Sequence, residues 1–479
     1  MSLKEKAVKG VLWSSIGTVG AGLLNFIVTM ILARVLSPAD YGVLEILLVF
    51  IVLAECFIDS GFSQAIIRDN NASEEDLSSV FYLNLFIALA LYLILFILSP
   101  YIATYYNEPN LLWLSRFVFL TFIFNSFSIV QNANFSRTLD FKTPAISSIC
   151  AIIISATISI FLAFKGYGVW ALASNHVIYS FLRTVFYWVR SKWRPVLKFS
   201  FQSIKRYFKF GSNLLIQGLV DKFVSNFESL LIGKVYTKSD LGYFSQARKL
   251  DGYIIQTSSS VIQRVTYPIL AKMSDTPEKL KSGYRRVLQT TIFVIAPILF
   301  FTISVSDNLL YCLFGAQWLE STPYLRLWCF TGFLVSFYSV FINIFLVNNK
   351  TKLLLKLSLI RQLIRLVAIV VFIRISIMSL MYTIVVVTLI SFFIYVYKGG
   401  RLIGYHLLEI LKDLYKTLFA ASVAAVAVYL FSEITSIDNG FLLLVIQLII
   451  MIFIYLLLSI ILRNPIYTEL KGIVISLFK

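Results

Sequence analysis

The sequence has little of what soluble enzymes and metalloproteins are built from. Only 14% of its 479 residues are charged, whereas a typical soluble domain has about 25%. It holds two histidines and four cysteines, each standing alone without a C-x-x-C pair: His176, His406, Cys56, Cys150, Cys312 and Cys329. Because a structural metal site needs such ligands in clusters, the sequence excludes one. We expect no metal and no cofactor, and cysteines that act as small apolar residues.

Catalytic signatures are missing as well. The sequence has no Gly-rich phosphate loop and no H-E-x-x-H motif, and no loop between apolar stretches combines His, Asp or Glu in a catalytic constellation. A membrane glycosyltransferase, polymerase or acyltransferase usually carries polar catalytic loops at the surface. We therefore expect a protein that is not an enzyme, with a polytopic membrane enzyme of polysaccharide synthesis as the alternative.

What the sequence does have is apolar length. Hydrophobic residues make up 59% of the chain, and a helix crosses the bilayer core with about 20 consecutive apolar residues. Lys and Arg number 42 against 24 Asp and Glu, a net charge of +18. In a soluble protein this excess would suggest nucleic acid, but no nucleic-acid module is recognisable. In a membrane protein it indicates basic loops that face anionic headgroups.

The apolar runs predict an all-α membrane protein with about fourteen transmembrane helices. The longest connection between them, 190–209, is too short to build a soluble domain. The predicted spans are 11–33, 42–66, 80–103, 112–131, 145–164, 168–189, 210–233, 246–271, 287–305, 324–347, 353–374, 377–397, 415–433 and 441–462.

The orientation follows from Lys and Arg in alternate connections. With the N-terminus in the cytoplasm, the inside connections are rich in basic residues, above all 190–209 and 272–286. The outside connections hold few: Arg34, Lys165, Lys234, Lys238 and Arg374. An even number of spans then places both termini in the cytoplasm.

An internal repeat divides the chain. LARVLSPADYGVLE at 32–45 aligns with IGKVYTKSDLGYFS at 232–245 at a constant offset of 200. Both copies follow the first span of a six-span block and have the same orientation, which indicates a parallel repeat. We expect a six-helix lobe at 1–197, a basic cytoplasmic interfacial linker at 198–209, a second six-helix lobe at 210–400, and two further helices and a tail at 401–479.

Several of these segments resemble a known family. LARVLSPADYGVLE, FIDSGFSQAIIRDN at 57–70, FSRTLDFK at 135–142, TYPILAKMSD at 266–275 and FGAQWLESTPYLRLWC at 314–329 are similar to Wzx-type polysaccharide flippases. These form the polysaccharide exporter branch of the MATE/oligosaccharidyl-lipid/polysaccharide exporter superfamily. The resemblance covers roughly residues 1–335.

The resemblance implies a function. Such a protein would move an undecaprenyl-diphosphate-linked oligosaccharide from the cytoplasmic to the outer leaflet of the bacterial inner membrane by alternating access. It would serve the assembly of O-antigen, capsule or exopolysaccharide, with a polymerase and glycosyltransferases as candidate partners. A multidrug exporter of the same superfamily is the alternative within this fold.

Cations at membrane depth are the candidates for binding the diphosphate, because charges there are costly and by default face the bundle interior. Arg361 and Arg365 are spaced i, i+4 on one helix face. Arg264 and Lys222 complete the predicted cationic set. Ion pairing within the bundle is the alternative role. Arg183 lies near the end of its span and is expected to snorkel to the interface.

Polar residues in the first span of each block are predicted to line a cavity. In the seventh span Asn213, Gln217 and Ser225 share one helical face, and in the first span Asn25 lies on a similar, weakly polar face. The alternative is that these side chains mediate helix packing.

Carboxylates in the spans are the candidates for coupling transport to a proton or Na+ gradient. Glu45, Glu55 and Asp59 fall on one arc of the second span, and Asp221 and Glu228 lie on the polar face of the seventh. Burial shifts a carboxyl towards the neutral form at physiological pH, as a proton carrier requires. Pairing with basic residues of neighbouring spans is an equal alternative.

Overall fold

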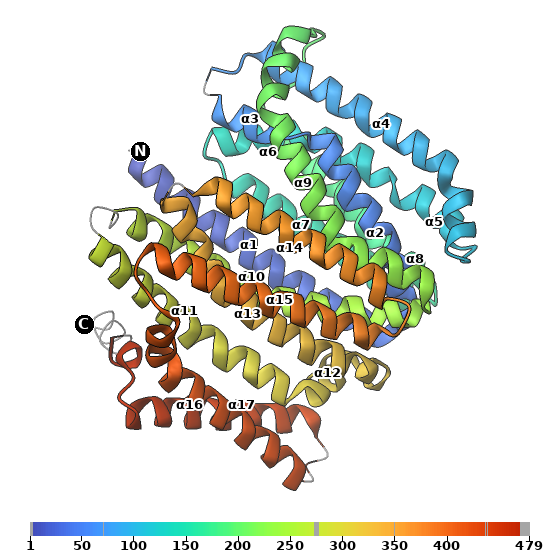
Figure 1. Ribbon diagram of the computed structural model, residues 1–479. Helices are drawn as coiled ribbons and strands as arrows, with labels where there is room; N and C mark the ends of the chain where they lie inside the picture. Colours follow the sequence, from blue (N-terminus) through green and yellow to red (C-terminus); the bar gives the residue numbers. More distant parts are fainter. Residues whose placement is uncertain are drawn as a thin grey trace. The chain divides into compact units, whose positions relative to one another are not determined.

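The computed structural model describes residues 3–69, 71–272, 277–348, 350–435, 437 and 439–469, and all regular structure within them is helical (Figure 1). The contacts divide the chain into two compact units, residues 1–245 and 246–479. This boundary lies beyond the predicted linker, because α9 and the start of α10 pack with the first unit. The predicted boundary of the repeat, at 198–209, remains a prediction about the two lobes.

The first unit contains the helices α1 to α9 and the start of α10. Within it α7 packs against α1 and α8, α6 lies between α4 and α8, and α2 packs against α9. Their bounds are α1 Leu3–Val35, α2 Pro38–Asp59, α3 Phe62–Arg68, α4 Glu74–Tyr105, α5 Leu111–Val118, α6 Leu120–Arg137, α7 Lys142–Phe164, α8 Val169–Arg190, α9 Phe201–Val235 and α10 Lys238–Lys272.

The second unit contains the rest of α10 and the remaining helices. Here α13 packs against α11 and α15, α14 lies against α15, and the hairpin of α16 and α17 packs on α11 (Figure 1). The bounds are α11 Pro277–Ser304, α12 Ser306–Phe314, the 3-10 helix η1 Ala316–Ser321, α13 Thr322–Val347, α14 Thr351–Phe372, α15 Ile377–Leu402, α16 Leu407–Ile434 and α17 Gly440–Ile461.

Each predicted span falls on helix, and two of them are broken. The span predicted at 42–66 ends at Asp59, because Ser60 and Gly61 adopt left-handed backbone conformations (φ 47° and 73°) before α3 begins. The span predicted at 112–131 is divided into α5 and α6 at Phe119. Among the described residues, ten segments are long and apolar enough to cross a membrane. The count of fourteen crossings remains a prediction, because α8, α9, α10 and α14 carry more polar residues.

The predicted basic linker is not a separate helix. The Ser200 side chain caps α9, so 201–209 forms the first turns of a helix that continues to Val235. Arg206 pairs with Asp76 at 2.8 Å, and the Tyr207 hydroxyl donates to Asp69 at 2.8 Å. These contacts fix the start of α9 to the corner between α3 and α4. Burial, together with this hydrogen bond, raises the pKa of Tyr207.

The internal repeat is visible in the structure around the turns that precede α2 and α10. Ser37 and Asp40 form a capping box at the start of α2, and Thr237 and Asp240 exchange the same hydrogen bonds two hundred residues later. Corresponding helices also end and begin at corresponding residues, at Val35 and Val235 and at Pro38 and Lys238. The local repeat is therefore structural as well as sequential.

The two copies of the turn touch each other through their glycines. A Cβ on Gly42 would lie 1.8 Å from the carbonyl oxygen of Lys238, and a Cβ on Gly242 would lie 1.9 Å from that of Pro38. The contact is reciprocal, because Pro38 and Lys238 are themselves equivalent in the repeat. Each glycine is needed for close approach of two backbones rather than for a special φ.

Candidate functional site: a polar cavity in the first unit

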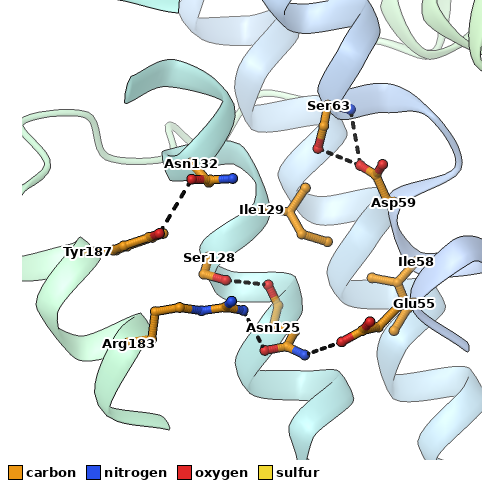
Figure 2. A pocket seen from close by; sticks show the side chains of 10 residues that line it. All are labelled: Glu55, Ile58, Asp59, Ser63, Asn125, Ser128, Ile129, Asn132, Arg183 and Tyr187. Carbon is orange, nitrogen blue, oxygen red and sulfur yellow. Dashed lines mark hydrogen bonds between the residues drawn. The ribbon is translucent and has the colours of Figure 1, made fainter. Parts of the chain in front are cut away.

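A cavity of about 230 Å³ lies among α2, α3, α6 and α8 in the first unit. Most of the side chains that line it are polar or charged (Figure 2). They are Glu55, Ile58, Asp59, Ser63, Asn125, Ser128, Ile129, Asn132, Arg183 and Tyr187. The cavity lies where these helices end: Asp59 is the last residue of α2, and Tyr187 lies in the last turn of α8.

A three-residue hydrogen-bonded chain crosses one side of the cavity. The Asn125 amide nitrogen donates to Glu55 Oε1 at 2.8 Å, and Arg183 Nη2 donates to Asn125 Oδ1 at 2.9 Å (Figure 2). The amide orientation follows from its neighbours, since a carboxylate only accepts and a guanidinium only donates. Asn125 thus separates an anion from a cation and is held by both. The arrangement keeps opposite charges at the cavity without a direct ion pair.

Asp59 is positioned by the turn between α2 and α3. Its Oδ1 accepts from the backbone nitrogen of Ser63 at 3.1 Å and from the Ser63 hydroxyl. The sequence analysis assigned Asp59 to the coupling candidates, and the structure shows that it also caps α3. The Asp59 side chain also lines the cavity (Figure 2).

Asn132 and Tyr187 form the opposite wall. The Tyr187 hydroxyl donates to Asn132 Oδ1 at 3.4 Å, a long and therefore weak bond. Ser128 donates to the backbone oxygen of Asn125 at 2.9 Å, which leaves its oxygen able to accept. Ile58 and Ile129 provide the apolar part of the lining.

The structure brings only two of the predicted coupling residues into this cavity. Glu55 and Asp59 line it, whereas Glu45 is 3% exposed and lies ten residues earlier, about 15 Å along α2 at 1.5 Å per residue. The structure therefore places Glu55 and Asp59 at one cavity and Glu45 away from it, and the predicted coupling role of the three carboxylates remains a prediction. A shared helical face does not bring side chains together when they lie almost three turns apart.

The predicted residues of α1 and α9 do not line the cavity either. Gln217, Asp221, Lys222 and Ser225 are exposed on α9, and Glu228 is fully buried. Asn25 is exposed on α1. The side chain of Asn213 lies outside the described residues, and so does that of Arg264 on α10. The predicted roles of all these side chains remain predictions.

In the second unit, Arg361 has a well-defined place. Its Nη1 donates to the Tyr338 hydroxyl at 2.6 Å, and it borders a small apolar cavity between α14 and α15. In the part of the chain that the structure describes, no carboxylate pairs with Arg361. Arg365 is half-buried one turn further along α14 and has contacts of its own.

Arg183 corrects the sequence analysis most clearly. We expected it to snorkel, yet it hydrogen-bonds Asn125 and lies 5.4 Å from the centre of the Tyr179 ring. Sequence reasoning also missed Asn125 and Asn132. The available signal was that Asn125 lies within a predicted span and Asn132 directly after it, since polar residues at membrane depth are costly and by default functional or paired.

These observations define a multi-pass helical membrane protein with a charged cavity within its bundle. Residues 31–323, more than half of the chain, match the family described as "Polysaccharide biosynthesis protein", and the chain belongs to this family. The predicted resemblance is confirmed. The protein is a membrane protein of the polysaccharide exporter type.

Two relatives show the extent of the similarity. The chain is 24% identical to the "Teichuronic acid biosynthesis protein TuaB" of Bacillus subtilis (strain 168) over 335 residues, which is 70% of this chain and 69% of that protein. It is 27% identical to the "Lipopolysaccharide biosynthesis protein WzxC" of Escherichia coli (strain K12) over 342 residues, with 70% and 69% covered.

Solved structures share the fold. The chain is similar to "Lipid II flippase MurJ, inward closed conformation" with a TM-score of 0.78 and 16% identity, covering 95% of this chain and all of that one. A multidrug resistance MATE family transporter in an inward-facing conformation gives a TM-score of 0.61 at 15% identity, with 82% and 98% covered. At such identities the similarity establishes the fold alone.

Proposed function

We propose that this chain is a flippase that moves an undecaprenyl-diphosphate-linked oligosaccharide from the cytoplasmic to the outer leaflet of the bacterial inner membrane. The family match gives the biological context. The observation that carries the proposal is the Glu55–Asn125–Arg183 chain, because charged side chains that are linked across a cavity between predicted spans fit a polar path. The lipid-linked sugar would come from glycosyltransferases and pass to a polymerase.

The chemistry of the substrate sets the requirements. A sugar headgroup with two phosphates cannot cross hydrocarbon, since each unsatisfied polar group costs several kcal/mol there. The protein has to offer polar groups to the headgroup and leave the polyprenyl tail in lipid. In our proposal the two repeats alternate between inward and outward access. Arg361 and Arg365, with Lys222 and Arg264, receive the diphosphate.

The proposed orientation puts the cavity near the cytoplasm, because α2 and α8 both end there in the predicted topology. We expect reporter fusions after Lys209 and Arg286 to be cytoplasmic and fusions at Lys238 and Ser321 to be external, as the distribution of Lys and Arg requires. Enzymatic activity of reporters that fold on only one side of the membrane measures this. An external result at Lys209 would reverse the topology and with it the direction of loading.

We propose that Glu55 couples transport to a proton gradient. Glu55 lines the cavity, and its carboxylate is held by the Asn125 amide rather than by a direct ion pair, which leaves it able to exchange a proton. We expect Glu55→Gln to weaken the response of transport to an imposed pH gradient by about tenfold. Transport in proteoliposomes under separate pH, Na+ and potential gradients measures this, with Glu75→Gln, an exposed residue of α4, as the control. If transport by Glu55→Gln responds to the pH gradient as strongly as transport by the parent protein does, the proposal is contradicted.

A multidrug exporter is the second candidate, because MATE family multidrug transporters share this fold. The lining of the cavity argues against it. Drug pockets are mostly apolar with few polar groups, whereas here charged and amide side chains dominate. A membrane enzyme of polysaccharide synthesis would need a catalytic constellation, and the one hydroxyl–carboxylate pair in the described lining, Ser63 with Asp59, holds the turn between α2 and α3.

A further inference from the structure

We infer that the cavity of the first unit binds one sugar ring of the transported headgroup. This rests on the proposed function and assigns a part of the substrate to a named site. The carrying observations are the mixed charge of the lining, the volume of the cavity and the open hydrogen-bonding groups at its surface.

The charges of the lining disfavour the other candidate ligands. Two carboxylates, Glu55 and Asp59, face a cavity that holds a single cation, Arg183. The carboxylates repel a diphosphate, and the guanidinium weakens the attraction for a metal cation, at distances where unit charges interact strongly. An apolar molecule would leave the amides and carboxylates without partners. A neutral, polar ligand meets none of these penalties.

The volume selects the size of that ligand. A pyranose with its hydroxyls takes roughly the space of five or six liquid waters at about 30 Å³ each. The cavity has about 230 Å³, which accommodates one ring and leaves space for bridging water. The remainder of the glycan would extend beyond the cavity.

The hydrogen-bonding groups match a ring of hydroxyls. Each hydroxyl donates once and accepts twice, so it needs both kinds of partner. Glu55 and Asp59 offer carboxylate oxygens that accept. Arg183 offers donors beyond its bond to Asn125, because a guanidinium carries five N–H groups and this bond engages only Nη2. The Asn132 amide nitrogen is a further donor, because only its oxygen is engaged, by Tyr187.

Two substitutions test the site without touching the Glu55–Asn125–Arg183 chain. Asn132→Ala removes a donor from the wall, and Ile129→Phe fills the cavity while keeping every polar group. Asn134→Ala is the matched control, since Asn134 lies on the same helix and does not line the cavity. The probes are undecaprenyl diphosphate and its glucosyl, galactosyl and N-acetylglucosaminyl forms, bound to the purified protein in nanodiscs.

We expect the parent protein to bind at least one sugar-bearing lipid tenfold or more tightly than the sugar-free lipid. Both cavity variants should reduce this ratio about tenfold while binding the sugar-free lipid as the parent does, which also shows that they are folded. Asn134→Ala should keep the ratio.

Three results would overturn the inference. A parent protein with no preference for any sugar would show that the cavity holds water only. An unchanged ratio in both cavity variants would place the sugar elsewhere and leave the flippase proposal standing. Failure of the parent protein to bind any of the four lipids would refute the proposed function, and the sugar site would be refuted with it.

Discussion

Arg361→Ala is expected to reduce flipping of the lipid-linked sugar by roughly 100-fold to 1,000-fold, which corresponds to about 3–4 kcal/mol. In our proposal the guanidinium makes charge-assisted hydrogen bonds to the diphosphate, each worth about 1.5–3 kcal/mol. Its fork suits two phosphate oxygens at once, so Arg361→Lys should restore only part of the rate. The rate is measured in proteoliposomes with equal amounts of folded protein.

Two controls separate ligand binding from a structural role of Arg361. Its observed hydrogen bond is to the Tyr338 hydroxyl, so a purely structural role predicts that Tyr338→Phe has the same effect as Arg361→Ala. Binding of the diphosphate predicts a much smaller effect of Tyr338→Phe. Arg374 is exposed and lies just beyond the end of the same helix. Arg374→Ala should therefore leave the flipping rate unchanged. If Arg361→Ala flips the lipid-linked sugar as fast as the parent protein does, Arg361 does not bind the diphosphate.

The second large effect concerns stability. Gly42→Ala is expected to destabilise the protein by about 3 kcal/mol, at the upper end of the usual cost of overpacking. The new methyl group would lie 1.8 Å from the Lys238 carbonyl oxygen, and this neighbour is backbone that cannot rotate away. Gly242→Ala should act in the same way through the Pro38 carbonyl oxygen. Thermal denaturation of the purified protein in detergent measures the loss.

Gly22→Ala provides the matched control for these substitutions. Gly22 is also helical, and a Cβ there would meet nothing within 4 Å. Replacing it should stabilise the protein slightly, because alanine is favoured over glycine in a helix by up to about 1 kcal/mol. If Gly42→Ala and Gly242→Ala have the same melting temperature as the parent protein, the backbones at these two glycines do not pack as closely as described.

The sequence was most informative where its signal is local or periodic. Apolar runs located the helices, and the offset of 200 located two turns that adopt the same capped structure. Carboxylates inside an apolar run pointed to Glu55 and Asp59, because a buried charge is costly anywhere in the span. Motif similarity identified the family.

The sequence was least informative where several helices meet. The sequence shows only that Arg183 lies near the end of its predicted span, which suggests snorkelling. It does not show that Asn125 of α6 lies within hydrogen-bonding distance of Arg183. Glu45 and Glu55 were grouped because they lie at similar angles around the helix axis, although they are far apart along that axis. The contacts that hold the basic start of α9 against α3 and α4 depend on residues far apart in the sequence.

The central claim is tested most directly by following a fluorescent undecaprenyl-diphosphate-linked sugar across the bilayer of proteoliposomes, with a membrane-impermeant quencher to report the leaflet. The account predicts protein-dependent movement of this lipid that is lost in Arg361→Ala, with no export of a cationic drug by the same vesicles. Export of the drug without movement of the lipid-linked sugar would contradict it and establish the multidrug exporter instead. Chemical conversion of the lipid-linked sugar would contradict it in favour of the membrane enzyme.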